Sequence, residues 1–176
     1  MRRSLPVIAA LTVGLIAAPA FSKMPKEEIV VPIKTSTGAD AGKVTFTDTK
    51  KGLKIRIKLE NVPFGMHGVH IHMTGACDAP DFKTAGGHFN PDGKQHGFQN
   101  PMGHHAGDMP GNVDVGENHE GEATFTVDYL SLTPGAANSV LGHSIVVHEK
   151  ADDEKTDPSG ASGNRIACGV IPATLD

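Results

Sequence analysis

The chain has 176 residues and carries 16 Lys and Arg side chains against 20 Asp and Glu side chains. No basic tract indicates a nucleic-acid-binding surface, and the acidic surplus disfavours contact with anionic lipid. We therefore expect neither a nucleic-acid partner nor a stable membrane association, and the length suits one domain with a hydrophobic core.

Residues 1–22 have the layout of a cleaved secretory signal peptide. Arg2 and Arg3 precede the apolar run LPVIAALTVGLIAAPAF, and small residues around Ala20 offer cleavage sites. A membrane anchor is the alternative, but the run is shorter than the roughly 20 residues that a spanning helix needs. We predict export and a mature domain of residues 23–176, whose formal charge is 14 − 20 = −6 without the two arginines.

Strand patterns dominate the mature domain. In LKIRIKLE (53–60) apolar and charged residues alternate, which gives a strand one buried and one solvated face, and Lys50-Lys51-Gly52 before it predicts a tight hairpin. Further predicted strands are 28–35, 43–49, 68–73, 122–130, 143–149 and 165–171. The pattern indicates an antiparallel all-β fold, either a sandwich or a flattened barrel.

Two long stretches without strand patterns, residues 74–112 and 150–164, interrupt the fold. Irregular loops of this length are uncommon in a compact domain and are usually functional. Cys77 precedes most of the first stretch and Cys168 follows the second. In an exported protein such a pair predicts one disulfide, which would close 168 − 77 = 91 residues and stabilise the fold by about 4–5 kcal/mol. Metal binding by the two thiols is the alternative.

Histidines gather at ligand spacing in the same region. His70 and His72 lie two apart in a predicted strand, so both rings face one side and can bind copper or zinc. Residues 86–108 contain few apolar side chains but supply three nitrogens and one carboxylate, which match a closed zinc site: His88, His96, His105 and Asp108. A bound metal would then serve as the core of this loop. A flexible metal-scavenging loop is the alternative.

Five segments in order resemble the signatures of the copper/zinc superoxide dismutases, most closely the exported bacterial type. They are GMHGVHIHMTGAC, AGGHFNPDGKQHG, HHAGDMPGN, VVHEKADD and GNRIACGVI, between residues 65 and 171. The resemblance implies a flattened eight-stranded antiparallel Greek-key barrel or sandwich with two long functional loops. It also implies one copper and one zinc ion per subunit, a periplasmic location, and a homodimer or a monomer.

The resemblance also assigns the site residue by residue. The implied copper ligands are His70, His72, His88 and His148. The implied zinc ligands are His88, His96, His105 and Asp108, so that His88 bridges the two ions. Asp152 resembles the carboxylate that links His70 to His96, and Arg165 resembles the arginine that guides the anionic substrate. Cys77 and Cys168 resemble the family disulfide.

The implied activity is the dismutation of superoxide through a Cu(II)/Cu(I) cycle, which protects the cell envelope from oxidative damage. One superoxide reduces Cu(II) and leaves as dioxygen, and a second oxidises Cu(I) and leaves as hydrogen peroxide after taking two protons. A non-catalytic protein of the same fold that buffers or delivers copper and zinc is the competing function. That function would not require Arg165, Asp152 or a bridging His88.

Overall fold

The computed structural model describes residues 28–175, so the predicted signal peptide lies outside the described part of the chain. Nine strands form one antiparallel sheet. In chain order they are β1 (Glu28–Thr35), β2 (Asp40–Thr49), β3 (Gly52–Glu60), β4 (Gly65–His67), β5 (Val69–His72), β6 (Val113–Val115), β7 (Glu120–Val127), β8 (Ser144–His148) and β9 (Arg165–Val170). One 3-10 turn, η1 (Lys83–Ala85), lies between β5 and β6. Across residues 28–175 no helix is long and apolar enough to cross a membrane.

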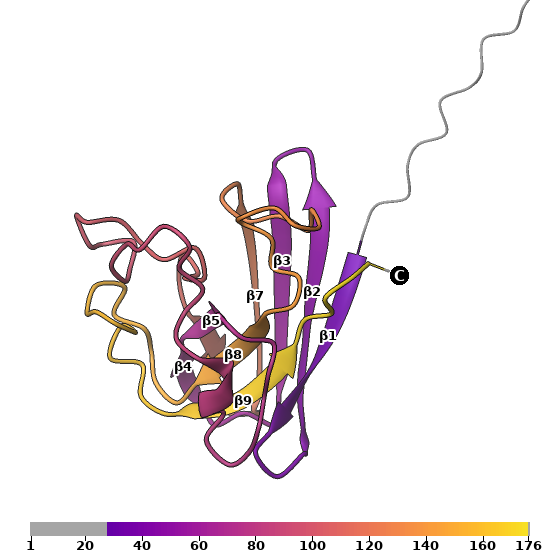
Figure 1. The fold of residues 1–176 in the computed structure, drawn as a ribbon. Coiled ribbons are helices and arrows are strands. Elements are labelled where there is room, and N and C mark those ends of the chain that lie inside the picture. The colour runs from indigo at the N-terminus through magenta and orange to yellow at the C-terminus, as the bar shows by residue number, and fades with distance from the viewer. Residues whose placement is uncertain (1–27, 176) are drawn as a thin grey trace, which may run out of the picture.

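The sheet curls until its two edges almost meet. The strand order is β4-β6-β7-β3-β2-β1-β9-β8-β5. The neighbours β4–β6, β3–β7, β1–β9 and β5–β8 are non-sequential, and among them β3–β7 and β1–β9 give Greek-key connections. The two edge strands, β4 and β5, are separated in the chain only by Gly68. Because the first and last strands of the sheet are consecutive in the chain, the twisted sheet forms a nearly closed barrel (Figure 1).

The prediction of an antiparallel all-β barrel is confirmed. The seven predicted strands correspond to β1, β2, β3, β5, β7, β8 and β9. β4 and β6 were not predicted, because a strand of three residues is too short to display alternation. If β4 and β5 are counted as one strand interrupted at Gly68, the barrel has the eight strands that the family resemblance implies.

The barrel interior is filled by one face of each long strand. Leu53, Ile55, Ile57 and Leu59 of β3 are fully buried, while Arg56 between them is exposed, as the alternation predicts. Phe46 of β2 is buried opposite Ile55. This interior supplies most of the hydrophobic stabilisation and makes the barrel the rigid support on which the loops are fixed.

Both long loops lie beside the β5, β8 and β9 side of the barrel (Figure 1). On the inner side of these strands Ile71 and Ile145 belong to the main core, whereas Val146 and Cys168 belong to a second, smaller apolar cluster. The first loop supplies Phe82 to that second cluster. The loop therefore covers one face of the sheet, and the site lies between the two.

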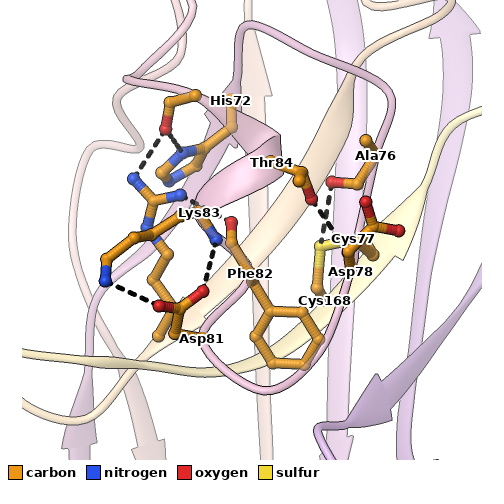
Figure 2. Close-up of a disulfide and its surroundings, with 11 residues drawn as sticks. His72, Ala76, Cys77, Asp78, Asp81, Phe82, Lys83, Thr84 and Cys168 are labelled. Carbon is orange, nitrogen blue, oxygen red and sulfur yellow. Dashed lines mark hydrogen bonds and ion pairs between the residues drawn. A yellow bond between two sulfur atoms is a disulfide. The ribbon is translucent and has the colours of Figure 1, made fainter.

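The disulfide between Cys77 and Cys168 joins this loop to β9, which confirms the predicted pairing. Figure 2 shows it beside the turn that carries Asp81 and Phe82. The loop also has a second apolar anchor, because Phe89 is buried in the main core. The expectation that residues 86–108 have no core contact of their own is therefore wrong at Phe89.

Candidate metal centre

Backbone hydrogen bonds place the ligand-bearing segments next to β5. Ile71 donates its N–H to the carbonyl of Gly107 and accepts from the N–H of Phe89, over 2.9 and 2.8 Å. His88 consequently lies in register with His72. On the other side of β5, the antiparallel pairing with β8 and of β8 with β9 brings in His148 and Arg165, which are register partners. Residues far apart in sequence thus meet on one face.

A first group of four buried histidines can hold a metal ion: their ring nitrogens lie within 4.8 Å of one another, and they are His70, His72, His88 and His148. His72 donates Nδ1–H to the carbonyl of Gly86 (2.9 Å), which leaves its Nε2 free as a lone-pair donor 3.3 Å from Nε2 of His148. His70 directs Nε2 to Asp152, which leaves its Nδ1 for a ligand.

Two atoms of this first group have no hydrogen-bond partner among residues 28–175. The described part of the chain contains three buried side-chain polar atoms without a hydrogen bond, and these are His70 Nδ1, His88 Nε2 and Ser144 Oγ. Buried polar atoms are nearly always satisfied, so two orphaned nitrogens in one cluster indicate a missing bond to a ligand. A metal ion that accepts nitrogen lone pairs fits this donor set.

A second group consists of His88, His96, His105 and Asp108. Oδ1 of Asp108 lies 2.8, 3.0 and 3.3 Å from Nδ1 of His88, His96 and His105, respectively. Four ligands at zinc-bonding distance in a tetrahedron lie about 3.3 Å apart, so this cluster is close to the size of a zinc site. Oδ2 of Asp108 accepts the backbone N–H groups of Gly97 and His105, which fixes the carboxylate.

His88 belongs to both groups. Its Nδ1 lies against the second group, and its Nε2 is one of the two orphaned atoms of the first. Neither ring nitrogen has a hydrogen-bonding partner outside the two groups within residues 28–175. The imidazole ring of His88 therefore lies between two adjacent groups, each of which could hold one metal ion.

Asp152 connects the two groups through their outer nitrogens. Its carboxylate lies 2.7 Å from Nε2 of His70 and 2.9 Å from Nε2 of His96. Asn112 holds the backbone of Asp152 by donating to its carbonyl (2.9 Å) and accepting its N–H (2.7 Å). Gly160 lies directly over this contact, with φ +64°, and a Cβ there would collide with Asp152 and His96. Such partners fix ring orientation and tautomer.

A pocket of about 420 Å³ opens onto the first group and is bordered by His72, His88, His148 and Arg165. Arg165 donates to the carbonyls of Phe82 (2.7 Å) and Gly86 (2.6 Å), so its guanidinium is held at the pocket wall. Burial lowers the pKa of Arg165, although arginine remains charged at neutral pH. Among the lining residues it is the one lysine or arginine.

Burial sets the charge of the first group. It lowers the pKa of His70 and of His148 to about 4 and that of His88 to about 3. The pKa of His72 falls further for the same reason. These rings are neutral at pH 7 and carry the lone pairs that a metal needs. In the second group burial opposes protonation of His96, but Asp108 and Asp152 outweigh it and raise the pKa of His96 to about 9.

The other four histidines lie outside these groups. His67 hydrogen-bonds the carbonyls of His148 and Pro63, while His104, His119 and His143 each hydrogen-bond a backbone carbonyl. Lys83, in the first long loop, is paired with Asp81 at 2.6 Å. Asn112 and Tyr129, which contact the site residues Asp152 and Asp108, carry no local sequence signal because their partners are distant in the chain.

The pKa shifts predict how the metal-free chain responds to acid. An unfolded histidine titrates near pH 6.5, so between pH 6.5 and 4 the unfolded chain binds more protons at His70, His88 and His148 than the folded chain. The free energy of unfolding should fall across this window, by up to about 1.4 kcal/mol per pH unit for each ring. His96 does not oppose this, because the stabilisation from its raised pKa is complete below pH 6.5 and is lost only as pH rises toward 9.

Denaturant unfolding of the chelator-treated protein at pH 6.5, 5.5 and 4.5 measures this slope. Stability that stays constant over the three pH values would contradict the buried, neutral state of these rings.

Comparison with known proteins agrees with this geometry. Residues 40–171 match the family described as copper/zinc superoxide dismutase (SODC). A Cu-Zn superoxide dismutase of Aquifex aeolicus is 41% identical over 143 residues, covering 79% of this chain and 84% of the relative. One from Deinococcus radiodurans is 35% identical over 185 aligned positions, covering 98% and 99%.

Solved structures show the same fold. The crystal structure of a SOD-like protein from Bacillus subtilis superposes with a TM-score of 0.76 at 40% identity, covering 81% of this chain and 97% of that chain. Together with the match over residues 40–171, this likeness leads to one assignment. The chain belongs to the copper/zinc superoxide dismutase family.

Proposed function

We propose that this protein is a superoxide dismutase with copper bound by His70, His72, His88 and His148 and zinc bound by His88, His96, His105 and Asp108. The observation that carries the proposal is the position of His88, which offers one ring nitrogen to each group. Copper and zinc are the cofactors of the family. A protein that only stores metal has no need for two sites that share a ligand.

The donor sets support the assignment of each ion. Three nitrogens and one carboxylate suit a closed zinc site, and four imidazoles suit copper. Bound copper supplies one-electron chemistry between Cu(II) and Cu(I), whereas zinc is inert to redox change. In the second group the protein shields Asp108, which is 1% exposed, from water, and this shielding favours a structural ion.

The chain's own residues perform the remaining tasks. Arg165 attracts superoxide and holds it at the pocket wall, because its guanidinium is fixed by two carbonyls and the residue lines the pocket. A local positive group can outweigh a net charge near −6 where the cleft is narrow. His88 can hold a proton at Nε2 beside the bound anion, since Nδ1 stays engaged in the second group. Asp152 keeps His70 and His96 in the tautomers that expose their Nδ1 atoms.

The activity is tested by inhibition of cytochrome c reduction in a xanthine oxidase assay with copper- and zinc-loaded protein. We expect dismutation by the wild type and a loss of at least about 100-fold in His88→Ala, because both groups lose a ligand. His119→Ala, which changes a histidine outside the groups, is the matched control. If the wild type binds both ions and leaves superoxide untouched, the buffering function replaces the enzyme.

The role of Arg165 is tested by Arg165→Ala. We expect kcat/KM to fall by about 10-fold or more and its dependence on ionic strength to weaken, because the variant lacks the cation that steers the anion. Arg56→Ala is a suitable control, since Arg56 is an exposed arginine of β3 paired with Glu122. Steady-state rates from low to high salt measure the effect, and an unchanged rate would refute it.

We further propose that residues 1–22 are removed on export to the periplasm and that residues 23–176 form the mature enzyme, which protects the cell envelope. The support is the charged, apolar and small-residue order of the first 22 residues. Mass spectrometry of the protein from a fractionated bacterial host should find the mature form, starting near residue 23, in the periplasmic fraction. An intact Met1 in the cytoplasmic fraction would contradict the proposal.

A further inference from the structure

Three aromatic rings lie beside the second ligand group. Phe98 and His104 come from the first long loop, and Tyr129 follows β7 on the barrel. None of the three is a ligand in either group, and none borders the pocket above the first group. We propose that Tyr129, through this aromatic stack, is a positioning residue that holds the zinc ligands in place and slows the release of zinc. The inference rests on the zinc assignment made above.

Tyr129 contacts the backbone of a ligand directly. Its hydroxyl donates to the carbonyl of Asp108 over 2.9 Å. Asp108 is buried, and within residues 28–175 no other protein donor reaches that carbonyl. Loss of the hydroxyl would leave a buried acceptor unpaired, so the backbone at Asp108 would shift toward water or another donor. The carboxylate on the same residue would move with it.

His104 extends this contact to the neighbouring ligand. Its Nδ1–H donates to the carbonyl of His105 over 2.7 Å, and its ring lies edge-on to Tyr129 with centroids 4.7 Å apart. His104 also stacks on Phe98, with ring centroids 4.0 Å apart and 20° between the planes, and the Phe98 and Tyr129 centroids lie 6.1 Å apart. Phe98 is two residues from the ligand His96.

The stack therefore joins two loop segments, one that carries His96 and one that carries His105 and Asp108, to Tyr129, which follows the barrel strand β7. The loop here is rich in glycine and has few apolar contacts, so its own backbone does little to fix these segments. Aromatic pairs with this geometry contribute beyond their buried area. A rigid support outside the ligands keeps the four donor atoms at bonding distance when the ion transiently loses one bond.

The test is the rate of zinc transfer from the fully loaded protein to a chromogenic chelator. Tyr129→Phe keeps the ring and removes the hydroxyl, and we expect zinc release about three- to tenfold faster. Tyr129→Leu removes both, and we expect release about 10- to 100-fold faster. Phe64→Leu, which changes an exposed aromatic residue outside the stack, should release zinc at the wild-type rate.

A spectroscopic readout separates positioning from general loss of stability. With Co²⁺ in place of zinc, Tyr129→Phe should alter the visible d–d bands that report ligand geometry, while copper is released at the wild-type rate. The inference is overturned if Tyr129→Phe and Tyr129→Leu both keep the wild-type zinc release rate, or if zinc and copper release accelerate equally. If the wild type itself takes up neither zinc nor Co²⁺ at this site, the zinc assignment fails and the inference fails with it.

Discussion

His88 belongs to both groups that could hold a metal ion, and the positions of the other site residues are related through this single ring. It requires one cluster on the β5 side, where His72 is its register neighbour, and another on the loop side around Asp108. The backbone bonds of Ile71 with Phe89 and Gly107 hold the ring at that boundary. The barrel strand β5 supplies His70 and His72 on one side of His88, and the first loop supplies His96, His105 and Asp108 on the other.

The polar cluster is buried against the outside of the sheet, where desolvation acts against every charge in it. Imidazoles respond by staying neutral, as the lowered pKa values of His70 and His148 show. Burial also favours the neutral form of Asp108, which for a carboxyl means a raised pKa. The surrounding histidines outweigh this effect and keep the pKa of the carboxyl low. A bound cation removes the remaining conflict, because it satisfies the orphaned nitrogens and balances the carboxylates together. The buried histidines and carboxylates are thus arranged to bind cations.

Features that depend on short spacing could be predicted from the sequence. The alternation in β3 and the i, i+2 pair His70 and His72 both follow from strand geometry. The full ligand assignment, including His148 and the role of Asp152, came from family resemblance, since no local pattern relates residues 82 positions apart. Asn112 and Tyr129 were missed for the same physical reason: the tertiary fold, rather than any turn or strand, brings each to its partner. β4 and β6 were missed because they are short.

Gly68 lies both between the two edge strands of the barrel and next to the candidate metal site. Gly68 separates the two edge strands, donates its N–H to the carbonyl of Lys150 and accepts the N–H of His148. A methyl group at Gly68 would press on both His70 and Asp152, at 3.2 and 3.1 Å. The residue that links the two edge strands therefore also holds the start of the second loop and the end of β8 against the site. A side chain at position 68 would consequently disturb the edge of the barrel and the histidine cluster together.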